Sequence, residues 1–178
     1  MKIGIFGGSF NPPHNMHRDI ALQLLDKGYL DKVIYVPTTT FYKKDGIIDF
    51  EDRYKMLQLL TNKFKGLEVS QIGSEENGEF TYQVLDYFKD IYQESDIYFI
   101  CGIDNLSEFD SWKNYEYILE NYKLFVVDRE GFDKEEQLKK YAQYREHILF
   151  ATINPVKLAS TSIGYKKQSI RRNCELFR

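Results

Sequence analysis

Two histidines and two glycines gather in one short segment near the start of the chain, residues 7–17. Gly7 and Gly8 are consecutive, so their backbone N–H groups can approach a phosphate without a Cβ in the way. His14 and His17 are three residues apart and would share one face of a helix, near the positive end of its dipole. Surface histidines after an ordinary strand and turn are the alternative. The glycine–proline context favours a site for an anionic, phosphate-bearing transition state.

Two further segments have residue types that suit a ligand site. Gly102 to Asp104 follows a strongly apolar run, and Ser160 to Ser162 opens the last predicted helix. Asp104 could bind a ribose hydroxyl or a metal, and it could equally cap a helix.

The elements that must position these residues are short apolar runs alternating with amphipathic segments. We predict strands at residues 2–6, 32–36, 67–72, 96–101, 123–127 and 147–152. We predict helices at residues 15–27, 49–64, 81–92, 115–121 and 132–144, and another that begins at Ser160 or Thr161. This alternation, without linkers or repeats, implies a single domain over residues 1–178. Its expected fold is α/β, a Rossmann-like doubly wound parallel sheet covered on both faces.

Ligands of such sheets bind outside the carboxyl ends of the strands, where the strand order reverses. The segments at residues 7–17, 102–104 and 160–162 each follow a predicted strand. We therefore expect all three to lie at one edge of the sheet and to form one site.

Composition narrows the function classes. The chain is 43% hydrophobic and 29% charged, with a net charge of -3, which is typical of a globular protein and argues weakly against a general nucleic-acid binder. Two cysteines are too few for a disulfide framework, and we expect Cys101 to be a buried thiol. With no signal pattern and no apolar stretch near the ~18 residues that span a membrane, we expect a cytoplasmic protein without a membrane partner.

Residues 8–17 read Gly-Ser-Phe-Asn-Pro-Pro-His-Asn-Met-His, which resembles the signature of the HxGH nucleotidyltransferase superfamily. Within it, the chain is similar to the bacterial nicotinate-nucleotide adenylyltransferases from Met1 to about Ile163. The feature that indicates this pyridine-nucleotide branch is the Gly-x-Asp-x-Leu stretch at residues 102–106, followed by Trp112. Further similar segments are Lys44, residues 53–57, Phe80 with Thr81, residues 129–132 and residues 160–163.

The resemblance implies that the 5′-phosphate of nicotinate or nicotinamide mononucleotide attacks the α-phosphorus of ATP and releases pyrophosphate, a step of NAD biosynthesis. No covalent enzyme intermediate is expected. Mg²⁺ is expected as a cofactor held mainly by phosphate oxygens and water, not by a set of protein ligands. The implied partners are ATP and a pyridine mononucleotide, with no nucleic acid, and a homo-oligomer is left open.

The resemblance also assigns roles to residues. His14 and His17 would contact the triphosphate, with His17 stabilising charge at the reacting phosphate. The residues assigned to ATP and its phosphates are Gly7, Gly8, Ser9, Phe10, Lys44, Gly102, Asp104, Ser160, Thr161 and Ser162. Thr81 and Trp112 would frame the acceptor base, although Trp112 could instead be a half-buried core aromatic. Lys44 fits a solvated loop slightly better, and Arg53, Arg129 and His147 are expected at solvent or ion-pair positions.

The sequence departs from the family pattern at three places. Met16 stands where the family has glycine before the second histidine, and Gly164 stands where the final motif has arginine. An arginine fork binds phosphate more strongly than its charge alone would. The chain also ends at Arg178, before the helix that usually closes the family domain. Two alternatives therefore stay open: a nucleotide-binding module of the same fold that has lost catalysis, and a transferase with another phosphorylated acceptor, against which Trp112 counts.

Overall fold

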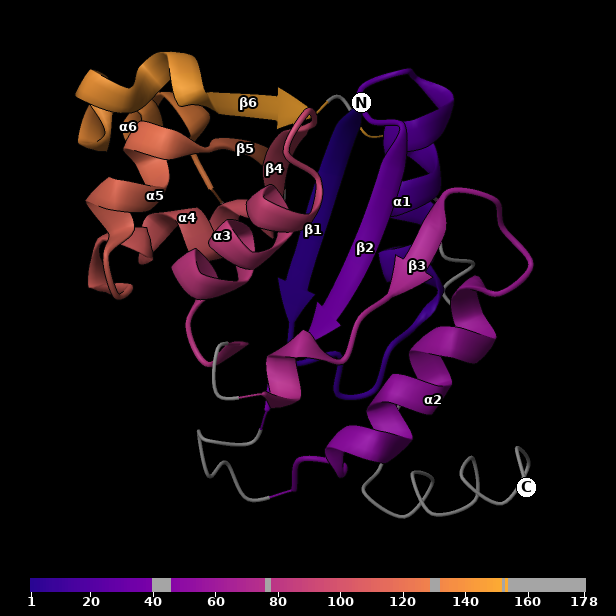
Figure 1. The fold of residues 1–178 in the computed structure, drawn as a ribbon. Coiled ribbons are helices and arrows are strands. Elements are labelled where there is room, and N and C mark those ends of the chain that lie inside the picture. The colour runs from indigo at the N-terminus through magenta and orange to yellow at the C-terminus, as the bar shows by residue number, and fades with distance from the viewer. Residues whose placement is uncertain (40–45, 76–77, 129–131, 152, 154–178) are drawn as a thin grey trace.

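A computed structural model of the chain describes residues 1–39, 46–75, 78–128, 132–151 and 153. Over these residues the protein is an α/β structure built on one parallel sheet (Figure 1), with strand order β3-β2-β1-β4-β5-β6. The predicted Rossmann-like, doubly wound sheet is therefore confirmed. Lys44, Ser160, Thr161 and Ser162 lie outside the described residues, as do Arg129 and the last predicted helix.

The six strands are β1 (Lys2–Gly8), β2 (Lys32–Pro37), β3 (Leu67–Val69), β4 (Asp96–Gly102), β5 (Lys123–Val127) and β6 (Ile148–Ala151). Every neighbouring pair is parallel. β5 has the predicted bounds, β2, β4 and β6 differ from the prediction by one residue at one or both ends, and two bounds differ by more. β1 continues through Gly8, where a tight turn was expected, and β3 ends at Val69 because the chain enters a 3₁₀ turn, η1 (Ile72–Ser74), with Ile72 buried.

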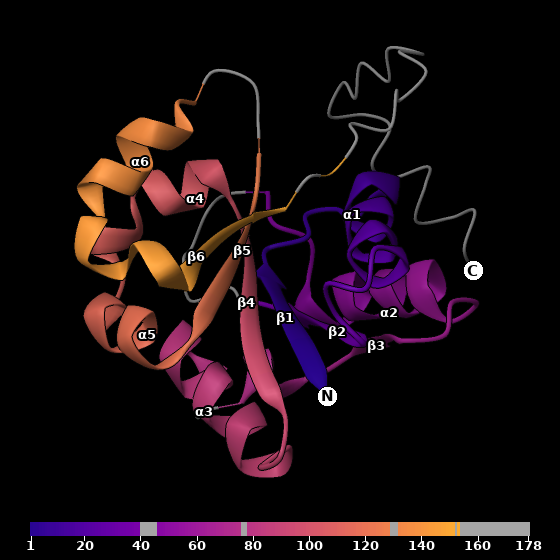
Figure 2. The same ribbon diagram turned by 90° about the horizontal axis from the view of Figure 1, so that it is seen from above.

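Helices cover both faces of the sheet (Figure 2). α1 (Asn15–Asp26) and α2 (Phe50–Thr61) lie on one face. On the other face lie α3 (Thr81–Ile91), α4 (Ile103–Ser107), α5 (Tyr115–Asn121) and α6 (Lys134–Lys140). The short turns η3 (Phe109–Ser111) and η4 (Ala142–His147) complete the described helical elements.

The helix predictions were wrong in three details. Neither α4 nor η3 was expected, since their residues looked like a polar connection. The helix predicted at residues 132–144 is two elements, because α6 ends at Lys140 and the chain continues as η4. α2 ends at Thr61, three residues early, and Asp49 occupies its N-cap position without making a side-chain capping hydrogen bond.

The core consists of two apolar layers, one on each face of the sheet. Alternate residues of β1 serve opposite layers: Ile3 and Ile5 pack on the α3 side, and Phe6 packs on the α1 side. Because both faces are covered, the strands carry continuous apolar runs, which is why the sequence revealed them. Cys101 is buried as predicted, and its burial raises the pKa of the thiol.

The described helices include none with the length and apolar character that crossing a bilayer requires.

Gly73 provides a test of how η1 packs against the end of β2. A Cβ at this position would lie 2.2 Å from the carbonyl oxygen of Pro37, which is rigid backbone. We expect Gly73→Ala to lower the free energy of unfolding by about 1–3 kcal/mol, the usual cost of overpacking, as measured by urea denaturation. Ser74→Ala, an exposed position in the same turn, is the control and should have little effect. Equal stability of Gly73→Ala and the unaltered protein would contradict the packing.

Candidate active site

The candidate site lies at the carboxyl edge of the sheet, between β1 and β4. These strands are neighbours, and the strand order reverses there, with β2 and β3 on one side and β5 and β6 on the other. The segment 9–17 follows β1, and the segment 102–104 spans the end of β4 and the start of α4. The structure therefore brings together two of the three predicted segments, while residues 160–162 are outside its description.

The two histidines face each other, as the sequence predicted. Their ring centroids are 3.8 Å apart and the ring planes differ by 25°, a stacked arrangement. The backbone N–H of His14 donates to Nδ1 of His17 at 3.2 Å. Accepting that hydrogen requires an unprotonated Nδ1, so the neutral His17 ring carries its hydrogen on Nε2. The contact thus makes Nε2 of His17 a hydrogen-bond donor.

Aromatic side chains fix the orientation of His17. The Phe10 ring meets the imidazole edge to face at 5.0 Å, and the Phe6 ring does so at 6.1 Å. The hydroxyl of Tyr35, a fully buried residue of β2, donates to the carbonyl oxygen of His17 at 3.0 Å. Burial raises the pKa of Tyr35, so its hydroxyl keeps the hydrogen that it donates. The start of α1 is therefore anchored to the middle of the sheet.

The glycines lie inside a strand and not in the tight turn that the sequence analysis predicted for them. Gly7 and Gly8 pair with β2 inside the sheet, and the turn comes at Ser9 and Phe10. A Cβ on Gly7 would lie 3.0 Å from the Phe99 ring, so the absence of a side chain there serves packing. Phe10 has a positive φ of 44° and a buried ring. A phosphate contact from Phe10 can come only from its backbone, and Ser9 is the exposed residue of the turn.

Arg53 was expected at a solvent or ion-pair position, and that prediction is wrong. It is 0% exposed, and its guanidinium donates to backbone carbonyls, to Ser9 at 2.6 Å, to Ile48 at 2.8 Å and to Thr38 at 2.9 Å. A signal for this burial exists in the sequence, because Arg53 is four residues before Leu57 on the buried face of α2.

Asn11 makes a second link between the turn and the chain before α2, one that sequence reasoning missed. Its side-chain oxygen accepts from the Ile48 N–H at 2.9 Å, and its side-chain nitrogen donates to the Gly46 carbonyl at 3.4 Å. The segment after β1 is therefore tied to the segment before α2 by two polar side chains, Asn11 and Arg53.

Beside the turn, the carboxyl edge contains a small pocket of about 40 Å³. Its lining includes Gly7, Thr38, Thr81 and Phe99. Trp112 meets Phe99 edge to face at 5.8 Å, and it also contacts Phe109, at 4.8 Å between ring centroids. The half-buried Trp112 contacts Phe99, and Thr81 lines the same pocket as Phe99, so the structure brings this predicted pair to the same part of the edge.

Gly102 and Asp104 lie where β4 passes into α4. Gly102 is the buried N-cap residue, and Asp104 is a half-buried acid in the first turn. Within the described ranges, histidine, cysteine and acidic residues form no group of three that could hold a metal ion.

His147, expected at a solvent or ion-pair position, instead contacts the Leu119 carbonyl through Nδ1 on the far side of the molecule, which corrects that prediction.

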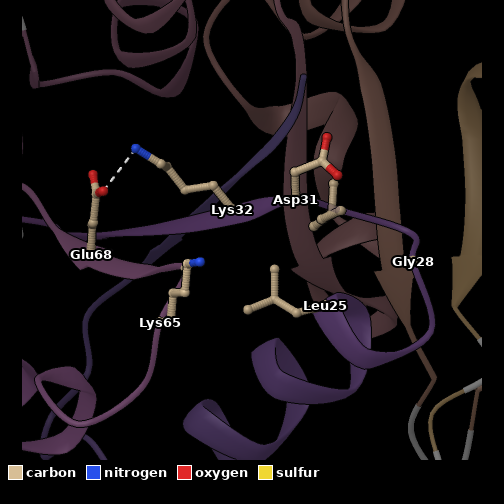
Figure 3. A pocket seen from close by; sticks show the side chains of 8 residues that line it. Leu25, Gly28, Asp31, Lys32, Lys65 and Glu68 are labelled. Atoms are coloured by element: carbon tan, nitrogen blue, oxygen red, sulfur yellow. Dashed lines mark ion pairs between the residues drawn. The ribbon is translucent and has the colours of Figure 1, made fainter.

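A larger pocket, about 550 Å³, lies at the opposite edge of the sheet, around the amino ends of β2 and β3 (Figure 3). Lys32 and Glu68 form an ion pair there at 2.7 Å. Asp31 at this edge accepts a hydrogen bond from the Lys2 backbone. The lining contains neither histidine of the stacked pair nor any part of the turn after β1. Volume alone would identify this pocket as the candidate ligand site. The histidine pair and the turn after β1, however, lie at the other edge of the sheet.

Known proteins resemble the chain over most of its length. The cytidylyltransferase-like family model matches residues 5–165. Proteins of Clostridium acetobutylicum and Endomicrobium trichonymphae, both named probable nicotinate-nucleotide adenylyltransferase, are 35% and 34% identical. The first alignment covers 97% of this chain and 88% of the relative, and the second covers 91% and 83%.

Solved structures share the fold. The nicotinic acid mononucleotide adenylyltransferase of Plasmodium falciparum, complexed with NaAD, has a TM-score of 0.71 at 20% identity, over 84% of this chain and 74% of that one. A Vibrio parahaemolyticus structure has a TM-score of 0.61 at 24% identity, over 79% and 86%. By sequence similarity over nearly its whole length, the chain belongs to the nicotinate-nucleotide adenylyltransferase family of cytidylyltransferase-like nucleotidyltransferases.

Proposed function

We propose that the protein joins the AMP moiety of ATP to nicotinate mononucleotide in NAD biosynthesis. A phosphate oxygen of the mononucleotide forms a bond to the α-phosphorus of ATP, the bond from that phosphorus to the β-phosphate oxygen breaks, and pyrophosphate leaves. The stacked histidine pair at the β1–β4 edge carries this proposal. Family membership supports it, as do the names of the relatives.

The proposed catalytic contribution is positioning and charge stabilisation. The attacking group is the acceptor's own phosphate, so the protein needs to supply no nucleophile. We assign the Nε2–H of His17 as the donor to the α-phosphate oxygens and His14 to the neighbouring phosphates. A donor held in place before the reaction stabilises charge as it develops in the transition state, without having to reorganise. The hydrogen bond from His14 to His17 Nδ1 supports this assignment because it leaves Nε2 as the donor.

The remaining phosphate contacts are assigned to the turn after β1. Gly8 is open enough that a Cβ there would make only ordinary contact with the Phe10 ring, and Ser9 is exposed. We propose backbone contacts from Gly8, Ser9 and Phe10, together with the Ser9 hydroxyl. The roles of Lys44, Ser160, Thr161 and Ser162 in holding the outer phosphates stay proposals from the family resemblance, as does the role of Gly102 and Asp104 beside the nucleotide.

Mg²⁺ is proposed to arrive with ATP. We propose that phosphate oxygens and water hold the ion, as is usual for Mg²⁺ bound with a nucleotide. When bound, the ion would neutralise charge on the phosphates, and Asp104 in the first turn of α4 is proposed as an acid beside the ion or a ribose hydroxyl.

Met16 bears on whether the site is active. It occupies the position of the family glycine, and its side chain is 38% exposed. A methionine that is not packed into the core has three rotatable bonds with which to turn away from a nucleotide. This exposure favours the active enzyme over the impaired module.

The direct test is turnover with ATP, Mg²⁺ and nicotinate mononucleotide, followed by pyrophosphate release and by the mass of the dinucleotide product. Nicotinamide mononucleotide and a pantetheine phosphate are the comparison acceptors. Turnover with a pyridine mononucleotide is the expected result. If no pyridine mononucleotide reacts although ATP still binds, the proposal fails. Activity gained only by Met16→Gly with Gly164→Arg would then identify the impaired module.

His17→Ala should reduce kcat by about 100- to 1000-fold, as removal of one preorganised transition-state donor does elsewhere. The Kd for a nonhydrolysable ATP analogue should change little, because the contact strengthens in the transition state. Steady-state kinetics and calorimetric titration measure the two quantities. His147→Ala, which removes a histidine that contacts the Leu119 carbonyl, is the control and should keep its turnover. Equal losses in kcat and affinity would contradict the role of His17.

Trp112→Ala should weaken mononucleotide binding by up to about 10-fold, since an aromatic pair contributes roughly 0.5–1.5 kcal/mol beyond area burial. Its contacts with Phe99 and Phe109 leave it half-buried, and we propose that the pyridine ring stacks on the uncovered part. ATP affinity should stay the same, and Trp112→Phe should retain part of the acceptor affinity. Unchanged acceptor affinity in Trp112→Ala would show that this residue serves core packing and does not bind the acceptor.

A further inference from the structure

Arg53 combines burial with contacts to two separate connections, the turn after β1 and the connection between β2 and α2. It is among the largest fully buried side chains of the described chain. One guanidinium donates to the Ser9 carbonyl after β1, to the Thr38 carbonyl after β2 and to the Ile48 carbonyl before α2. Thr38 and Ile48 belong to the same connection, between β2 and α2, so this side chain joins that connection to the turn after β1.

Burying a guanidinium costs desolvation free energy that an apolar side chain of the same volume would not. Desolvation of the charge must be offset by well-aligned hydrogen bonds, and an apolar side chain of similar volume often serves stability equally well. A planar guanidinium offers something that an apolar group does not, which is five donors in a fixed geometry. Its contacts with three carbonyls set the distances between the loops that carry them.

The two connections belong to different halves of the candidate site. Ser9 is the exposed residue of the turn assigned to the ATP phosphates, and Thr38 lines the pocket that also contains Thr81. The Thr38 N–H donates to the Gly8 carbonyl at 3.0 Å, which gives the two loops a second, direct link. Arg53 therefore links the turn at residues 8–10 that is assigned to the ATP phosphates, the phosphate turn, with the loop that lines the pocket containing Thr81, the acceptor pocket.

We propose that Arg53 is a positioning residue that fixes the phosphate turn relative to the acceptor pocket. This inference rests on the proposed function. The guanidinium acts through the Ser9 and Thr38 carbonyls, and its role is to align the bound ATP with the attacking phosphate. In-line transfer requires the reacting atoms to be about 3–3.5 Å apart, and a misplacement of about 1 Å can lower the rate about 100-fold.

Arg53→Lys is the informative variant. It keeps the charge and the long apolar stem, but its single ammonium lacks the planar fork that spans three carbonyls. We expect kcat to fall by about 10- to 100-fold while each substrate alone, a nonhydrolysable ATP analogue or nicotinate mononucleotide, binds nearly as before. Arg53→Gln, a shorter and neutral side chain with two amide donors, is the second variant should Arg53→Lys not fold, and the same split is expected.

Leu57→Ala is the matched control. Leu57 is fully buried one turn further along α2, and its truncation should lower the melting temperature without touching the loops. Its kcat per folded molecule should equal that of the unaltered protein. If Arg53 has only a structural role, the arginine variants should resemble Leu57→Ala. Their kcat per folded molecule should then equal that of the unaltered protein.

The outcomes are distinguishable in one experiment. Unchanged kcat in folded Arg53→Lys overturns the inference, and so does a loss of kcat that is matched by equal losses in the affinity for each substrate. An equal loss in Leu57→Ala also overturns it. No turnover by the unaltered protein in the same assay overturns the proposed function, and this inference with it. Selective loss of kcat in the arginine variants, with turnover in both the unaltered protein and Leu57→Ala, supports the positioning role.

Discussion

Two connections leave the carboxyl edge of the sheet, after β1 and after β2, with backbone groups that no further strand can pair, and holding these connections together is the constraint on which the site depends. Backbone carbonyls and amides need hydrogen-bond partners, and here two side chains supply several of them. Arg53 serves the carbonyls of Ser9, Thr38 and Ile48, while Asn11 serves groups of Gly46 and Ile48. The geometry of the edge is consequently set by polar contacts within the loop layer as well as by the sheet below it.

The apolar layer beneath this edge holds the proposed catalytic histidine in place. Tyr35 of β2 reaches the carbonyl of His17, and the rings of Phe6 and Phe10 lie against the imidazole. The stack with His14 brings the two rings together, and the hydrogen bond to Nδ1 leaves Nε2 of His17 as the nitrogen that can donate. Core packing and hydrogen bonds around the segment from β1 to the start of α1 therefore fix the position of His17 and the ring nitrogen that donates.

Much of this arrangement could be predicted from the sequence, and the failures have identifiable physical causes. The strands were readable because burial on both faces leaves continuous apolar runs, and the convergence of His14 with His17 followed from their spacing before a helix. Arg53 was misjudged because charge is usually a sign of exposure, and its position on the apolar face of α2 received less weight. The role of Gly7 depends on the Phe99 ring of β4, a contact between distant parts of the chain that local patterns do not encode. α4 and η3 are too short for helical periodicity to appear.

The central claim is that ATP phosphates bind at the turn after β1 and not in the larger pocket at the other edge of the sheet. Backbone amide chemical shifts of ¹⁵N-labelled protein, followed during titration with a nonhydrolysable ATP analogue and Mg²⁺, test this most directly. The account predicts the largest shifts at Gly8, Ser9 and His17. Shifts confined to Gly28, Lys32 and Gly66, which line the other pocket, would contradict it.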